Sequence, residues 1–364
     1  MQYDKLMKRT AAYCLIFVVT AMSAMLYYCA NKIIVVADVA QDEVEQNAED
    51  GDGGEKIPAD IIAEDEKNHI NIDRSSQNTN YFCIPMPAGV KAEEVVMENH
   101  YMDRELWVMI EPKEMNGQET FYEENGVYGN CTDVLTGHYD VEKHRICLRF
   151  ALTDVYEYHS IFEDNTLYVE FMTPKETYDK VIVIDPAYGM NDMGVTVNGV
   201  NAKDVTLEIA KALKAKLDET DIKVYYTRMD DSNPSMGSRV QLASDTKADM
   251  LIRIEVGSAE SSKMYGTEAV YNSRFFIPGF GSVELADILE REVVTAISGK
   301  ANGLVEASDT DGVVSNATVP AAAIKVGYLT NAQEFILLQR EDYIQRIAEG
   351  IYQSIVKSYE EQNR

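Results

Sequence analysis

The chain has 364 residues, 46% of them hydrophobic, and its 61 acidic side chains outnumber the 33 basic ones, giving a formal net charge of -28. A chain of this length and hydrophobicity has enough apolar material for two modest domains with separate cores. So acidic a chain repels the phosphates of nucleic acids, which excludes direct nucleic-acid binding as a function class.

The amino terminus combines a basic tail with a long apolar run. Residues 1–10 hold three basic side chains, and residues 11–30 read AAYCLIFVVTAMSAMLYYCA. About 20 apolar residues are needed to cross a bilayer, and basic flanks stay in the cytoplasm. A cleaved signal peptide is the alternative, but its apolar core is typically about 7 to 15 residues and ends in small residues. We therefore predict a cytoplasmic basic tail (1–10), a transmembrane helix (11–30) and single-pass cell-membrane localisation, with all later domains on the extracytoplasmic face.

The next stretch is strongly acidic. Residues 38–66 contain 12 acidic side chains and one lysine. Such a segment cannot bury enough apolar surface to fold alone. We predict an acidic flexible linker over 31–79.

Over residues 80–175, hydrophobic side chains recur at every second position, which indicates a small β-rich domain. Strand patterns occur at 105–111 (ELWVMIE), 145–151 (RICLRFA) and 166–172 (TLYVEFM), and turn residues gather at 123–130 (EENGVYGN). Its three cysteines, Cys83, Cys131 and Cys147, leave one disulfide or three free thiols as open alternatives.

From residue 176 to 364, strands alternate with helices. The spacing predicts helices over 202–217 and 282–297, a helix capped by Asn331 with Glu334 three residues on, and a last helix. The predicted strands are 180–185, 222–227, 250–255, 267–271 and 322–326, and the last helix is marked by Ile344, Ile347, Ile351 and Ile355. This alternation indicates an α/β fold with a mixed, mostly parallel sheet flanked by helices.

The order of motifs then resembles a known family. In chain order, this region contains VIVIDP, KDVTLEIAKAL, KVYYTR, a later Arg239, KADMLIRI, GTEAVY and VGYLTN. Over residues 179–360, this order is similar to the type 3 catalytic domain of zinc-dependent N-acetylmuramoyl-L-alanine amidases. The resemblance implies cleavage of the amide between the lactyl group of muramic acid and the first stem-peptide residue. It also implies a zinc ion held by His, Glu and His, with a second Glu that moves protons. The β-rich domain is similar in its strand pattern and position to the AMIN-type modules beside such enzymes.

Each functional position of that family carries another residue here. Tyr188, Ala202 and Glu255 stand at the three zinc-ligand positions, and Lys325 stands at the catalytic glutamate. All five histidines and all five cysteines precede residue 180, so the α/β domain has neither imidazole nor thiolate. Zinc hydrolases use mostly these ligands. We therefore expect no family zinc, no other cofactor and no catalytic role at the four positions, with Glu255 and Lys325 facing each other as an ion pair.

Three functions stay open. The first is a catalytically inactive, membrane-anchored member of the family that binds peptidoglycan or another wall-processing protein. The alternative is an active hydrolase with a rebuilt non-zinc site made of Asp185, Asp192 and Glu255, and the third is a structural module for assembly. The candidate cleft residues for binding are Asp185, Asp192, Arg239 and Asn331.

Overall fold

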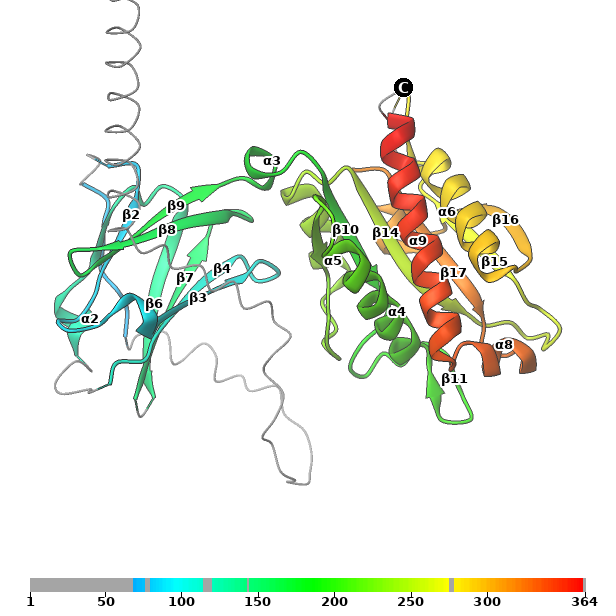
Figure 1. Cartoon of the computed structure of the whole chain (residues 1–364), viewed down its shortest axis with the longest axis horizontal. Helices are drawn as coiled ribbons and strands as arrows, with labels where there is room; N and C mark the ends of the chain where they lie inside the picture. The colour runs from blue at the N-terminus through cyan, green and yellow to red at the C-terminus, as the bar shows by residue number, and fades with distance from the viewer. Residues whose placement is uncertain (1–67, 76–78, 114–119, 143, 275–277, 363–364) are drawn as a thin grey trace, which may run out of the picture. The chain divides into compact units, whose positions relative to one another are not determined.

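The computed structural model describes residues 68–75, 79–113, 120–142, 144–274 and 278–362 (Figure 1). These residues form two compact units, 68–153 with 158–171, and 172–362 with 154–157. The predicted membrane helix and the linker up to residue 67 lie outside the described residues. Within the part that is described, no helix combines the length and the apolar composition that a bilayer crossing requires.

The amino-terminal unit contains two sheets with strand orders β1-β5-β2-β9-β8 and β3-β4-β7-β6. The rings of Phe82 and Phe150, one from each sheet, meet edge to face at 5.0 Å, so the sheets pack face to face. The three predicted strands are confirmed as β4, β7 and β9. The elements are β1 Ile72–Asp73, β2 Phe82–Pro85, η3 Ala92–Glu94, β3 Val95–His100, β4 Glu105–Ile110, α2 Phe121–Glu124, β5 Val127–Gly129, β6 Val134–Glu142, β7 Arg145–Leu152, β8 Glu157–Glu163 and β9 Thr166–Met172.

Two details of this unit correct or extend the sequence interpretation. The expected turn at 123–130 is wrong in part, because Val127 is fully buried inside β5. All three cysteines are free thiols, and burial raises the pKa of each. They therefore act here as small packing residues.

The second unit is built on a six-stranded sheet of order β13-β10-β14-β17-β15-β16. Strand β10 runs parallel to β13 and β14, and β14 runs parallel to β17. Strand β15 is antiparallel to β17 and parallel to β16. The mixed, mostly parallel sheet is thus confirmed. The strands are β10 Val181–Pro186, β11 Thr196–Val197, β12 Val200–Asn201, β13 Lys223–Tyr226, β14 Met250–Gly257, β15 Thr267–Tyr271, β16 Ala301–Glu306 and β17 Ala321–Tyr328.

One face of this sheet carries the main core of the unit. Alternate residues of the central strands, such as Ile182, Ile252 and Ile324, pack against α4, α6 and α9 (Figure 1). The predicted helix over 202–217 is confirmed as α4, and its apolar stripe is buried: Val205, Ile209, Leu213 and Leu217. The helices are α3 Pro174–Thr177, α4 Ala202–Leu217, α5 Met236–Asp245, α6 Ser282–Ile297, α7 Gly312–Ser315, α8 Ala332–Leu337 and α9 Glu341–Gln362.

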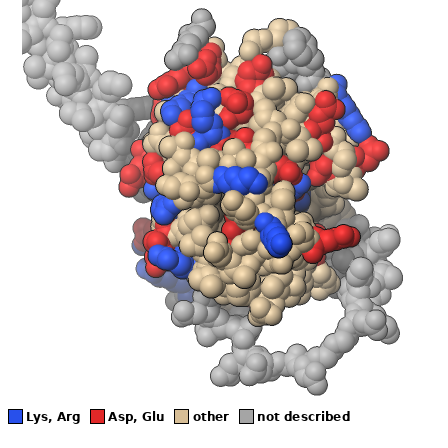
Figure 2. Space-filling view, turned by 90° about the vertical axis from the view of Figure 1, so that its right-hand side faces the viewer, with Lys and Arg blue, Asp and Glu red and all other residues tan. Residues whose placement is uncertain are grey.

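The opposite face of the sheet positions the site. The side chains of Asp185, Arg253, Glu255 and Lys325 alternate with the core residues along β10, β14 and β17, so they project to the side of α5 and α7. On the face of the unit drawn in Figure 2, acidic and basic side chains are interspersed with uncharged surface. That face has no continuous basic strip for a polyanion.

Candidate functional site

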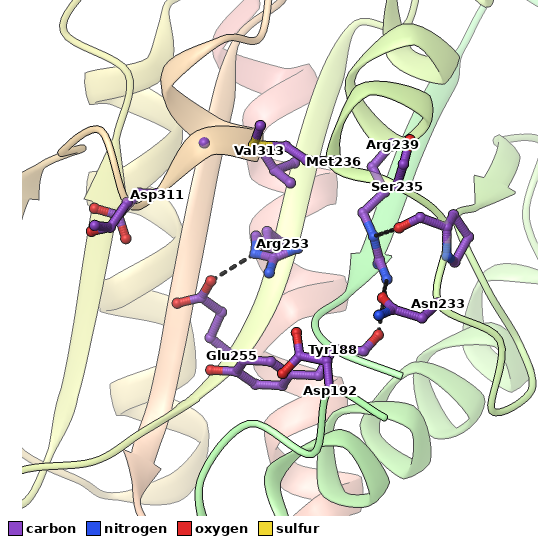
Figure 3. A pocket seen from close by; sticks show the side chains of 13 residues that line it. Tyr188, Asp192, Asn233, Ser235, Met236, Arg239, Arg253, Glu255, Asp311 and Val313 are labelled. Carbon is purple, nitrogen blue, oxygen red and sulfur yellow. Dashed lines mark hydrogen bonds and ion pairs between the residues drawn. The ribbon is translucent and has the colours of Figure 1, made fainter. Parts of the chain in front are cut away.

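Two cavities open at the carboxyl ends of β10, β14 and β17, where open α/β sheets usually bind ligands. The smaller, of about 260 Å³, lies against the first turns of α5 and α7 (Figure 3). The larger, of about 800 Å³, is bounded by Val195, Met264 and Tyr328. Tyr188 and Glu255 line both cavities, so these two side chains form the wall between them.

The four family positions converge on this cleft. Tyr188 follows β10, Ala202 is the first residue of α4, and Glu255 and Lys325 are register partners on β14 and β17. A Cβ atom at Gly194 would lie 2.8 Å from the Tyr188 ring and 2.9 Å from the Ala202 Cβ. Tyrosine and alanine therefore fill one small volume between them.

Asp185 is the centre of a buried ionic network. Its side chain is fully buried, and its Oδ1 accepts hydrogen bonds from Arg239 Nη1 and Thr227 Oγ1, both at 2.5 Å. Its Oδ2 is paired with Arg253 Nη1. Burial alone would raise the pKa of Asp185, but the two guanidinium groups and the Thr227 hydroxyl outweigh it and lower the pKa to about 2. Asp185 is thus a fixed anion that holds two arginines.

Arg253 is the site residue that sequence reasoning missed. Its Nε donates to Glu255 Oε1 at 2.6 Å (Figure 3). Its Nη1 bonds Asp185, so one guanidinium joins two carboxylates. The signal was present in the strand sequence LIRIEVG, since an arginine two residues before Glu255 on a buried strand projects to the same face. Arg253 thereby supplies positive charge at the Glu255 position.

The expected Glu255–Lys325 ion pair is wrong in its partners. The two residues are neighbours in register, but Lys325 Nζ bonds Glu268 Oε1 on β15 at 2.9 Å, and Glu255 bonds Arg253. Burial would lower the pKa of Lys325, but the hydrogen bond and charge of Glu268 outweigh it and raise that pKa. Three acids and three bases therefore balance across this part of the sheet: Arg239, Asp185, Arg253, Glu255, Lys325 and Glu268.

The residues present do not fit the zinc ion of the family. Of the three ligand positions, Ala202 has no ligating atom, Tyr188 has a phenol whose pKa is raised to about 12 by burial and by Glu255, and Glu255 is already bonded to a guanidinium. Across the described ranges, no three or more His, Cys, Asp or Glu side chains are grouped as a metal site would require. Glu255, the carboxylate at these positions, is engaged in an ion pair with Arg253.

The turn after β10 has an unusual backbone that Arg239 holds in place. Residues 188, 189 and 190 have φ of 70°, 139° and 46°. Arg239 is 3% exposed, and its Nη2 donates to the Tyr188 carbonyl oxygen at 2.8 Å and to Asn233 Oδ1 at 2.9 Å. Left-handed backbone disfavours side chains other than glycine, so these bonds determine where Tyr188 stands.

The remaining two candidate cleft residues, Asp192 and Asn331, lie apart from each other. Asp192 is exposed, lines the smaller cavity and accepts a hydrogen bond from the Gly194 amide at 3.1 Å. Asn331 caps α8 by accepting from the Gln333 and Glu334 amides, as predicted for the helix start, and it lines neither cavity. The Glu334 carboxylate does not complete a capping box; it accepts from the Gly266 and Tyr328 amides.

Comparison with known proteins gives consistent matches to one family. Residues 182–357 match the family described as N-acetylmuramoyl-L-alanine amidase. The chain is 28% identical over 182 residues to the uncharacterized protein YqiI of Bacillus subtilis, covering 50% of this chain and 86% of that one. A crystal structure of an N-acetylmuramoyl-L-alanine amidase from Clostridium difficile 630 is 31% identical, with 50% and 97% coverage and a TM-score of 0.47. The CwlD amidase of Clostridioides difficile, solved in complex with the GerS lipoprotein, is 26% identical, with 50% and 98% coverage and a TM-score of 0.46.

Proposed function

Because the chain belongs, through residues 182–357, to the N-acetylmuramoyl-L-alanine amidase family, we propose that it is a cell-envelope protein that binds peptidoglycan without cleaving it. The observation that carries this proposal is the ionic network in which Arg253 joins Asp185 to Glu255. A guanidinium bonded to two carboxylates occupies the place where the family pattern puts metal chemistry. The cleft around it is retained as two cavities that can take a ligand.

The alternative, a hydrolase rebuilt on Asp185, Asp192 and Glu255, has less support. A general acid or base needs a pKa near the working pH. The pKa of Asp185 is held at about 2 by two arginines and the Thr227 hydroxyl, and its side chain is fully buried. Glu255 and Asp192 would remain as the candidate acid and base, and Glu255 is bonded to Arg253.

A protein partner is a second candidate ligand. Three methionines near the cleft, Met190, Met193 and Met236, are 56%, 40% and 54% exposed. Exposed methionines are common on surfaces that bind other proteins. A wall-processing protein could therefore dock at the same edge of the domain.

The test uses the full chain in detergent and purified peptidoglycan. We expect the protein to sediment with peptidoglycan, to release no stem peptide, to purify without stoichiometric zinc and to keep its melting temperature when chelator is added. Zinc near one equivalent, or chelator-sensitive release of stem peptide, would show a working enzyme. No sedimentation with peptidoglycan would remove the binding proposal and leave the protein partner.

The proposed location is the cell membrane, with residues 11–30 as the anchor and the later domains on the extracytoplasmic face. For the amino-terminal β unit, the similarity to AMIN-type modules stays a prediction. Protease added to intact protoplasts should degrade the chain beyond residue 38, because it would lie outside. Full protection of that portion, with degradation only after lysis, would place it in the cytoplasm.

A further inference from the structure

Tyr188 lines both cavities, so its side chain lies at the boundary between them. Its ring and the Glu255 side chain are shared by the linings of both. The ring also fills the space beside Gly194, where a Cβ atom would lie 2.8 Å from it. A ligand long enough to reach from one cavity to the other must therefore displace this ring.

The backbone of the turn is fixed while the tyrosine side chain is not. Arg239 holds the Tyr188 carbonyl oxygen, the Gly189 amide donates to the Asp192 carbonyl oxygen at 3.0 Å, and Lys203 Nζ donates to the Met190 carbonyl oxygen at 2.9 Å. In contrast, none of the described residues gives or accepts a hydrogen bond at the Tyr188 hydroxyl. Packing alone retains the ring, so a rotation about its side-chain bonds breaks no hydrogen bond.

We propose that Tyr188 is an autoinhibitory gate: its ring divides the cleft in the closed state, and rotation of the ring joins the two cavities and admits an extended ligand. This inference rests on the proposed binding function, because the ligand is taken to be peptidoglycan. It adds a regulatory element that limits binding. If the closed state is favoured by about 1.4 kcal/mol or more, the apparent affinity is reduced about tenfold or more.

The turn supplies a matched set of variants for the test. Tyr188→Gly removes the ring and also relieves the strain of a left-handed backbone conformation at a residue with a side chain. Met190→Gly relieves the same kind of backbone strain two residues away and leaves the ring in place. Tyr188→Phe keeps the ring and removes only the hydroxyl, and Tyr188→Ala replaces the glycine variant if that one loses its cooperative melting transition.

Two measurements on the full chain separate the gate from the binding proposal. The first is the rate at which a thiol reagent modifies a cysteine introduced by Ala202→Cys, read by peptide mass spectrometry. Ala202 is fully buried beside the Tyr188 ring, so this rate reports ring displacement without any ligand. The second is the apparent affinity for purified peptidoglycan.

We expect Tyr188→Gly to raise both the labelling rate and the affinity about tenfold or more, with Tyr188→Phe and Met190→Gly close to the parent. Unchanged labelling in Tyr188→Gly would overturn the gate. Faster labelling with weaker binding would also overturn it, because the ring would then be a ligand contact. Faster labelling with no binding by any variant would support the gate and refute peptidoglycan as the ligand.

Discussion

Asp185→Asn is expected to lower the free energy of unfolding by about 3 to 5 kcal/mol, because it leaves the buried Arg239 guanidinium without its carboxylate and removes one of the two carboxylates that pair with Arg253. The side chain is fully buried and paired with both Arg239 and Arg253. An asparagine of the same size can keep one hydrogen bond but cannot neutralise two guanidinium groups. Urea denaturation of parent and variant gives the difference.

Asp342→Asn is the matched control, since it breaks an exposed aspartate–arginine pair with Arg340 at 2.8 Å. We expect no measurable change in stability there, because exposed pairs are screened by water and salt. A variant at Asp185 that is as stable as the parent would show that the two arginines are solvated and that the network is not a core element.

The same carboxylate should make stability depend on acid pH. Its pKa is about 2 in the folded protein, against about 3.9 in an unfolded chain. Because the folded pKa is the lower one, the contribution is fully present above about pH 4 and is lost as the pH falls toward 2, by about 2 kcal/mol. Asp185→Asn should lack this component of the acid transition, which thermal melts between pH 5 and 2 can measure.

The elements of the α/β unit were predictable because their periodicity is strong. The helix over Ala202–Leu217 and the strands at Val181–Pro186 and Met250–Gly257 bury continuous apolar faces, and burial leaves a clear pattern in sequence. Strand β16 was not predicted. It is a half-exposed edge strand with a glycine inside, so neither alternation nor propensity marks it.

The ionic partners could not be read from the sequence. The family motifs correctly placed Glu255 and Lys325 on adjacent strands, because parallel strands bring their carboxyl ends together. The choice of partner depends on the other neighbour of β17, which is β15. That antiparallel strand places Glu268 directly opposite Lys325. Strand order around the sheet is a global property, so local patterns gave the positions but not the pairing.

A second prediction concerns the ion pair between Lys325 and Glu268. Their side chains are 26% and 17% exposed, so solvent screens the pair only in part. In a double-mutant cycle with Lys325→Met and Glu268→Gln, we expect a coupling free energy of about 1 to 2 kcal/mol, between the values for exposed and fully buried pairs.

The control cycle replaces Glu268→Gln with Glu255→Gln. Glu255 is the register neighbour of Lys325 on the other side, but its Oε1 is bonded to Arg253. Only through-space attraction then couples Glu255 to the lysine. In this control cycle, the two changes in the free energy of unfolding should therefore add to within about 0.5 kcal/mol. A larger coupling to Glu255 than to Glu268 would mean that the lysine turns toward β14 in solution. Lys325 would then lie over the Arg253–Glu255 pair, and the wall between the two cavities would include a lysine as well as Tyr188.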